Sequence, residues 1–274
     1  MTVEPTPLSA HNPRLADLRR LTGRRRSRVE AGRYVIEGPV PIVEMLTAGI
    51  PLVELFVDAG EWADADERSP LRTATRLALD ADVPVWGLAD GVVASVADTD
   101  APQGVIAVAP RVTTDLDRLM AESGPVLVLI DVADPGNVGT LVRTAEAAGA
   151  AGVVVAGSTA DPFGPKAVRA SAGSAARVPI AEVATAAEVL AAASTAARPT
   201  VATVVEGGVA PEALDLTGPL CLLVGSEAHG LDGATVEACT LGVTLPMAGP
   251  VESVNVAVAG AVVLFEIARQ RRAR

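Results

Sequence analysis

The run PVLVLIDV, residues 125–132, decides the fold, because it is apolar at nearly every position. A strand with one solvated face alternates apolar and polar residues, whereas a strand covered by helices on both faces is a continuous apolar run. Further apolar runs follow at 153–157, 200–205 and 220–225, with helical segments between them. Strands that alternate with helices predict a parallel sheet covered on both faces. We therefore expect an α/β fold for residues 125–274.

A second set of short apolar runs lies upstream and predicts a smaller α/β domain. Its elements alternate along the chain: predicted strands at 33–38, 53–58, 83–88 and 104–110, and predicted helices at 12–28, 40–49, 70–80 and 90–96. The polar segment 111–124 is predicted to be a linker with one short helix. The chain of 274 residues exceeds the roughly 100–200 residues of a usual single domain. We therefore predict a domain at 1–110, a linker at 111–124 and a second domain at 125–274.

The charge of the chain is unevenly distributed. The net charge is −11, yet eight arginines fall within the first 33 residues and four more within the last six. The guanidinium group of arginine is planar and binds phosphate in a bidentate manner. A basic N-terminal segment on an otherwise acidic chain is therefore consistent with RNA binding. A solvated charged arm explains the same run of residues equally well. Charge alone therefore leaves both alternatives open.

Several kinds of protein are excluded by the sequence. Cys221 and Cys239 lack the spacing of a metal site or a disulfide framework, and both lie in apolar surroundings. The longest apolar stretch, VNVAVAGAVVLF (254–265), is shorter than the ~20 residues of a membrane span, and the first residues lack the apolar segment of an export signal. We therefore expect a cytoplasmic protein with no metal site and no membrane segment.

Three polar stretches interrupt the second domain, each at the end of an apolar run. They are DVADPGNVGTLVRTAEAAGA (131–150), LLVGSEAHGL (222–231) and LPMAGPVESVNVAVAG (245–260). In open α/β sheets, ligands bind beyond the carboxyl ends of the strands. The three stretches therefore predict a ligand site at one edge of the sheet.

Each stretch also has a purely local explanation. Asn137 can cap the helix that follows it, and His229 can be a turn residue hydrogen-bonded to backbone. Ser253 and Asn255 lie at or beside a predicted helix N-terminus, where a cap side chain accepts backbone hydrogen bonds. Burying an unpartnered hydroxyl or amide costs roughly 1–3 kcal/mol. Two capping candidates beside Glu252, where one suffices, therefore indicate that some of these groups face a ligand.

In order and spacing, the three stretches resemble the motifs of the SpoU (TrmH-like) family of RNA ribose 2′-O-methyltransferases, within the SPOUT superfamily. DPGNVGTLVRTAEAAG resembles the first motif, LLVGSEAHGL the second and LPMAGPVESVNVAVA the third. KAVRASAGSAARVPI (166–180) is similar to the segment between them. RYVIEG (33–38) and APQGVIAV (101–108) resemble the ribosomal-protein-like substrate-binding domain that many members carry. One departure is Ser-Val-Asn-Val, where Ser-Leu-Asn-Val is commoner.

The resemblance implies an enzyme that uses S-adenosylmethionine and no metal. It implies a C-terminal parallel-sheet domain with a deep trefoil knot, a smaller N-terminal RNA-binding domain, and a homodimer through the C-terminal domain. It assigns the catalytic centre to Arg143, with Asn137, Glu227, Ser253 and Asn255 around it. It assigns the cofactor pocket to loop residues whose backbone can read adenine: Thr203, Gly225, Gly230, Leu245, Met247 and Val254.

Arg143 is expected to grip the phosphate next to the target ribose. Arginine normally stays protonated in proteins, so general-base action is the more demanding of its two possible roles. The predicted last helix, from about 254 to 272, bears on the dimer because it carries more apolar residues than one buried face needs: Val258, Ala261, Val262, Phe265 and Ile267.

Four alternatives remain at this point. Ribosomal RNA is favoured over transfer RNA as the substrate, and a member that confers antibiotic resistance by modifying ribosomal RNA differs only in its target nucleotide. A nucleotide-binding oxidoreductase needs a Gly-x-Gly-x-x-Gly after its first strand, which VLIDVADPGNVG does not provide. A non-catalytic RNA-binding protein has no need of the polar residues assigned to the catalytic centre.

Overall fold

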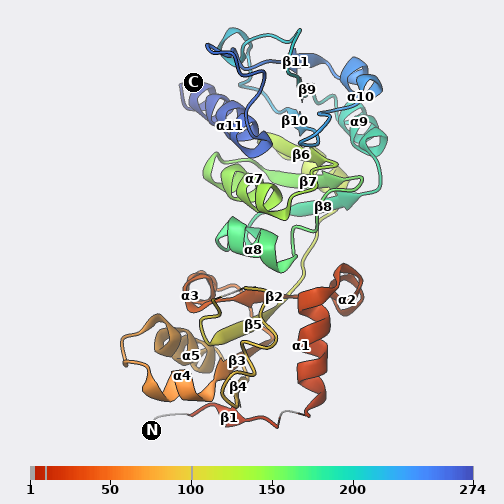
Figure 1. Ribbon diagram of the computed structural model, residues 1–274. Coiled ribbons are helices and arrows are strands. Elements are labelled where there is room, and N and C mark those ends of the chain that lie inside the picture. The colour runs from red at the N-terminus through yellow and green to blue at the C-terminus, as the bar shows by residue number, and fades with distance from the viewer. Residues whose placement is uncertain (1–3, 10, 100, 274) are drawn as a thin grey trace. The chain divides into compact units, whose positions relative to one another are not determined.

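The computed structural model describes residues 4–9, 11–99 and 101–273, and the chain forms two compact units (Figure 1). Unit 1 comprises the residues up to Val112 together with Phe163–Ala176. Unit 2 comprises Thr113–Pro162 together with the residues from Arg177 onward. Arg274, one of the predicted C-terminal cluster of arginines, lies outside the described residues.

Unit 1 is built on a five-stranded sheet of order β1-β4-β3-β5-β2. Its elements in chain order are β1 (Thr6–Pro7), α1 (Pro13–Gly23), α2 (Arg25–Ala31), β2 (Arg33–Glu37), α3 (Pro39–Thr47), β3 (Glu54–Asp58), α4 (Ala59–Asp64), α5 (Pro70–Asp80), β4 (Val85–Leu88), β5 (Val105–Pro110) and α8 (Pro165–Ser171), with a 3₁₀ turn at Ser174–Ala176. Strand β4 is parallel to β1 and β3, whereas β5 is antiparallel to β2 and β3. The four strands predicted for this part of the chain are present, in a mixed sheet.

Two helices predicted for unit 1 are wrong. The predicted helix 12–28 is broken at Arg24, which has an extended backbone, into α1 and α2. The buried Arg28 holds this corner, because its Nη1 donates to the carbonyls of Leu21 (2.7 Å) and Thr22 (3.2 Å) at the end of α1. The predicted helix 90–96 is a series of turns, since Gly91 adopts a left-handed conformation and donates its N–H to Asp58 Oδ2.

Unit 1 also holds a segment that lies between two strands of unit 2 in the sequence. The Phe163 ring packs on the Tyr34 ring of β2, with 5.2 Å between the ring centroids. Arg169 of α8 donates to Glu37 Oε2 at 2.9 Å, and Glu37 is only 8% exposed. An aromatic contact and a largely buried ion pair therefore hold this segment in unit 1.

Unit 2 is built on a six-stranded sheet of order β11-β9-β10-β6-β7-β8. Its elements are α6 (Leu116–Met120), β6 (Val126–Ile130), α7 (Pro135–Ala147), β7 (Gly152–Ala156), β8 (Ile180–Val183), α9 (Ala186–Thr195), β9 (Thr200–Thr203), a 3₁₀ turn (Pro211–Ala213), β10 (Cys221–Val224), α10 (Gly233–Ala238), β11 (Leu241–Val243) and α11 (Val256–Arg272). All five strand pairs are parallel. The parallel sheet predicted from PVLVLIDV is confirmed, and every side chain of β6 is buried.

Helices cover both faces of this sheet, with α7 and α11 on one face and α9 and α10 on the other (Figure 1). Helices α7 and α11 pack closely because Gly260 has no side chain, and a Cβ there would lie 2.6 Å from Leu141 Cδ2. Cys221, the first residue of β10, is buried, and this burial raises the pKa of its thiol to about 11. None of the described helices is long and apolar enough to cross a membrane.

Candidate functional site

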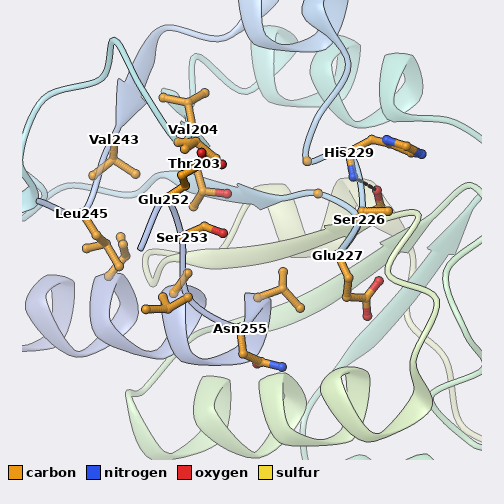
Figure 2. Close-up of a pocket in the computed structure, with 18 of the residues that line it drawn as sticks. Thr203, Val204, Ser226, Glu227, His229, Val243, Leu245, Glu252, Ser253 and Asn255 are labelled. Atoms are coloured by element: carbon orange, nitrogen blue, oxygen red, sulfur yellow. Dashed lines mark hydrogen bonds between the residues drawn. The ribbon is translucent and has the colours of Figure 1, made fainter. Parts of the chain in front are cut away.

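Three neighbouring strands of unit 2, β9, β10 and β11, end at one edge of the sheet, and the loops that follow them enclose a cavity of about 420 Å³ (Figure 2). Its lining comes from Thr203 at the end of β9 and the two residues after it, 225–230 after β10, Val243, Leu245 and Met247, 252–255 before α11, and Val256, Ala259 and Val263 of α11. This is the position at which open α/β sheets bind their ligands. The second and third polar stretches of the sequence therefore meet in one cavity.

Glu227, in the loop after β10, is bonded to the start of α7. Its carboxylate accepts hydrogen bonds from the backbone N–H of Ala133 (3.0 Å) and Asp134 (3.1 Å) and from Asn137 Nδ2 (2.9 Å). Desolvation acts to raise the pKa of Glu227, but the hydrogen bonds from Asn137 and from these backbone groups outweigh it and hold the pKa below its ordinary value. The charged carboxylate thereby ties the loop after β10 to the loop after β6.

Asn255 joins α11 to the same group of residues. Its Oδ1 caps α11 by accepting from the N–H of Ala257 (2.8 Å) and Val258 (3.3 Å), and its Nδ2 donates to Asn137 Oδ1 (3.1 Å). Asn137 thus lies between Glu227 and Asn255 and bonds to both. All three polar stretches are linked through these side chains.

The predicted cap of α7 needs correction. Asn137 lies within α7, and the N-cap is Asp134, whose Oδ1 accepts the Asn137 N–H at 3.0 Å. The helix begins at Pro135, a residue well suited to the first helical position because its missing N–H has no partner to lose there. The Asn137 side chain is therefore free for the bonds to Glu227 and Asn255.

Gly225 and Gly230 form the turn that separates β10 from the rest of the lining. Ser226 and Gly230 exchange two backbone hydrogen bonds, of 3.1 and 2.9 Å, and Gly230 has a φ of +66°. A Cβ on Gly225 would collide with the backbone of Gly230 and Leu231. Glycine at position 225 therefore allows the loop to approach its own backbone closely.

Two polar residues of the third stretch have no side-chain partner within the described part of the chain. Glu252 and Ser253 are exposed, and neither side chain makes a hydrogen bond or ion pair with any of the described residues. In Figure 2, Glu252, Ser253 and Asn255 follow one another along one wall of the cavity, with Glu227 across from them. Of the two capping candidates, Asn255 caps α11, which leaves Glu252 and Ser253 available to a ligand.

Arg143 lies outside the cavity. It is an exposed residue of α7, six positions beyond Asn137, and its side chain has no bonded partner within the described part of the chain. At 1.5 Å and 100° per residue, it is displaced by about 9 Å and rotated by about 240° from Asn137. The structure thus brings together Asn137, Glu227, Ser253 and Asn255 but not Arg143.

The six residues predicted to bind the cofactor all line the cavity: Thr203, Gly225, Gly230, Leu245, Met247 and Val254. Sequence reasoning did not assign four further lining residues: Val243 of β11, and Val256, Ala259 and Val263 of α11. For the three residues of α11, the apolar pattern of the predicted last helix was the signal available. No group of His, Cys, Asp and Glu among the described residues has the arrangement of a metal site.

A cavity built by strand-end loops of a parallel sheet is the ligand site of an open α/β protein. The chain belongs to the SpoU rRNA Methylase family, whose model matches residues 124–265. Residues 12–107 match a second model, that of the MRM3-like substrate binding domain. The family predicted from the three motifs is confirmed.

Relatives over nearly the whole chain agree with this assignment. A 23S rRNA (uridine(2479)-2′-O)-methyltransferase of Streptomyces viridochromogenes is 33% identical over 271 residues, which covers 96% of this chain and 92% of the relative. An uncharacterized tRNA/rRNA methyltransferase of Mycolicibacterium vanbaalenii is 35% identical over 245 residues, covering 87% of this chain and 77% of the relative. The chain is thus an RNA methyltransferase that depends on S-adenosylmethionine.

Solved structures share the fold. The SpoU methyltransferase AviRb from Streptomyces viridochromogenes, in complex with the cofactor AdoMet, has a TM-score of 0.83 and 31% identity, and the match covers 96% of this chain and 99% of that one. An AdoMet-bound rRNA methyltransferase from Sinorhizobium meliloti has a TM-score of 0.82 and 28% identity, with 96% and 97% covered. The α/β fold with a parallel sheet is therefore that of SpoU methyltransferases.

The cavity fits S-adenosylmethionine in size and chemistry. Its volume of about 420 Å³ lies within the roughly 300–1,000 Å³ of small-molecule pockets. Val204, Leu245 and Met247 supply apolar surface for a flat base, and Thr203 and Ser253 supply hydroxyl groups for polar atoms. Among the described lining residues, the charged side chains are carboxylates, and there is no lysine or arginine. This lining suits a ligand with a positively charged centre.

Proposed function

We propose that this protein methylates a ribose 2′-hydroxyl in ribosomal RNA, and that the cavity at the ends of β9, β10 and β11 is its cofactor site. The observation that carries the proposal is the joining of all three motif stretches by Glu227, Asn137 and Asn255 beside this cavity. A 2′-O-methyltransferase of 23S rRNA, 33% identical over nearly the full length, supports this substrate.

The chemistry divides between the cofactor and the protein. Bound S-adenosylmethionine supplies a methyl group on a sulfonium, whose sulfur keeps the bonding electrons when the ribose oxygen takes the methyl. A ribose hydroxyl is a poor nucleophile until it loses its proton, so the protein must position it closely and provide a proton acceptor. Ser253, in the cavity wall and without a hydrogen-bond partner among the described residues, contacts the ribose or relays that proton. Asn137, Asn255 and Glu227 fix the loops that define the geometry.

Arg143 acts on the RNA in this proposal. It is exposed on α7 and outside the cavity lining, so its guanidinium is free to take a phosphate beside the target ribose. Guanidinium groups bind phosphate in a bidentate manner and remain charged at neutral pH.

The N-terminal unit holds the RNA substrate. Seven exposed arginines of unit 1 lie on or beside α1 and α2: Arg14, Arg19, Arg20, Arg24, Arg25, Arg26 and Arg33. The side chains of Arg19, Arg24 and Arg33 have no bonded partner within the described residues, so they are available to phosphate groups. We assign RNA binding to residues 1–110, linkage to 111–124, and cofactor binding and methyl transfer to 125–274.

The protein acts as a homodimer through unit 2. Val258, Val262 and Phe265 are 50%, 48% and 46% exposed, and their spacing places them in one stripe along α11. An exposed apolar stripe of this kind marks an interaction surface. Ile267, also expected to contribute, is fully buried within the unit.

A trefoil knot in unit 2 and a cytoplasmic location complete the proposal. The family match supports the knot, as does the path of the last segment. Strand β11 lies at the far edge of the sheet beyond β9, whereas α11, which follows it, packs on α7 near the middle. The cytoplasm is where ribosomal RNA is available to such an enzyme.

Mapping of 2′-O-methyl groups in RNA from cells with and without the protein tests the function. We expect one ribosomal RNA position to lose its methyl group in the deletion strain and to regain it on complementation. If the lost methyl group lies in transfer RNA, the substrate is transfer RNA and not ribosomal RNA. If it lies on a base, the ribose assignment is refuted.

A further inference from the structure

The charged side chains in the cavity wall are predominantly acidic. Two carboxylates, Glu227 and Glu252, line it, and no lysine or arginine is found among its described lining residues. Among the lining residues that the structure describes, His229 is the one with a basic side chain, and its ring points away from Ser253 in Figure 2. A cavity with this lining favours a cationic ligand over an uncharged one of the same shape.

The two carboxylates are not equivalent. Glu227 is engaged by two backbone N–H groups and by Asn137, and these dipoles compensate part of its charge. Glu252 has no bonded partner among the described residues, and it lies next to Ser253 in the wall. The negative charge of Glu252 is therefore the one left for a ligand.

Methyl transfer changes the charge of the cofactor. The sulfonium of S-adenosylmethionine is positive, and the thioether of S-adenosylhomocysteine is neutral, while the adenosine and amino-acid parts stay the same. Contacts to the shared parts cannot distinguish donor from product, whereas a carboxylate can, because its attraction acts on the charge that disappears.

We propose that Glu252 is a specificity residue that makes the cavity prefer the cationic methyl donor over its uncharged thioether product. This inference rests on the proposed use of the cavity as the cofactor site. Because Glu252 is exposed, water and salt screen it, and its removal should weaken donor binding by about three- to fivefold.

Calorimetric titration of the full chain measures this preference. The ligands are S-adenosylmethionine, S-adenosylhomocysteine, and sinefungin, which carries an amine in place of the methyl-sulfonium and is cationic there. For Glu252→Gln, we expect the Kd of the two cationic ligands to rise by about three- to fivefold and that of S-adenosylhomocysteine by less than about twofold. The charge-retaining Glu252→Asp should stay within about twofold of the wild type for all three ligands.

Glu206→Gln is the matched control. Glu206 is an exposed carboxylate in the loop after β9, next to the lining residue Val205, but it is not itself part of the lining. The same loss of charge there should leave all three affinities within about twofold of the wild type. Raising the ionic strength should shrink the Glu252→Gln effect on the cationic ligands.

The possible results separate this inference from the proposed function. Equal weakening of all three ligands in Glu252→Gln would overturn the inference, because it would indicate a role in shape and not in charge. Unchanged donor binding in Glu252→Gln, or an equal effect in Glu206→Gln, would also overturn it while leaving the cofactor site intact. A folded wild-type chain that binds none of the three ligands would overturn the proposed cofactor site together with the inference.

Discussion

Asn255 performs two tasks with different atoms, and substitution can separate them. Its Oδ1 caps α11 through the N–H groups of Ala257 and Val258, and its Nδ2 donates to Asn137 Oδ1. Asn255→Asp keeps the capping oxygen but places a second oxygen against Asn137 Oδ1. Asn137 cannot reverse its amide in response, because its Nδ2 donates to Glu227. The variant should therefore retain the helix cap and lose the link between the motifs.

The expected stability changes differ between the two substitutions. Asn255→Ala loses a cap worth about 1 kcal/mol and a hydrogen bond worth about 0.5–1.5 kcal/mol. Its free energy of unfolding should therefore be lower than that of the wild type by about 2 kcal/mol. A loss of that size corresponds to a fall in Tm of about 4–8 °C in a unit of this size. In Asn255→Asp, the lost hydrogen bond is offset by about 0.3–1 kcal/mol from a carboxylate at a helix N-terminus, so its Tm should change little.

Methyl-transfer activity should depend on the hydrogen bond between Asn255 and Asn137 and not on the stability of the fold. We expect methyl transfer by Asn255→Asp to fall by a factor on the order of 10 to 10², because the loops around the cavity lose their fixed geometry. Thr185→Ala, which removes the side-chain cap of α9 away from the cavity, should lower the Tm and leave transfer near the wild-type rate. Thermal unfolding and tritiated methyl transfer on the same preparations provide the comparison. Normal transfer by Asn255→Asp would show that the hydrogen bond to Asn137 has no part in catalysis.

Three further outcomes are expected. Arg143→Ala should bind S-adenosylmethionine almost normally and lose methyl transfer by a factor on the order of 10², with little rescue by Arg143→Lys; near-normal transfer in the assay would make Arg143 a mere surface residue. Phe265→Asp should sediment as a monomer of 27.7 kDa, whereas a wild-type protein already monomeric and active would contradict the dimer. The folded-state pKa of Glu227 is lowered, so its contribution to stability is fully present above the ordinary value of about 4.3 and disappears as the pH falls through the folded value. The stability difference between wild type and Glu227→Gln should therefore narrow on acidification from neutral pH, and a difference that stays constant in denaturant titrations would argue against this role.

The central strands could be predicted from the sequence because a strand buried on both faces is a continuous apolar run. PVLVLIDV is apolar along its length, and it forms β6 in the middle of the sheet. Strand β11, at one edge of this sheet, has no such run. Strand β11 is only three residues long, Leu241 is 38% exposed, and its partner β9 lies about 40 positions earlier in the chain. The pairing that makes it a strand is therefore set by tertiary structure.

The membership of the site was more predictable than its bonding. Polar residues that interrupt apolar runs stood out in the sequence, and four of the five proposed for catalysis lie together. Their partners did not stand out, because Asn255 is bonded to a residue 118 positions away and Glu227 to one 90 positions away. Local reasoning assigned the cap of α7 to Asn137, whereas Asp134 takes that task and frees the Asn137 amide.

The separation of Arg143 from the cavity follows from helix geometry and bears on how RNA enters. Asn137 and Arg143 are six residues apart on one helix, and the rotation of about 240° between them leaves their side chains facing directions about 120° apart, so they do not both point into the same pocket of one chain. Asn137 is engaged with Glu227 and Asn255, whereas Arg143 is exposed and unpaired within the described residues. If both serve one reaction, the RNA has to extend from the cavity mouth onto the exposed side of α7. The affinity of Arg143→Ala for RNA should then depend less on salt than that of the wild type, because one phosphate contact has been removed.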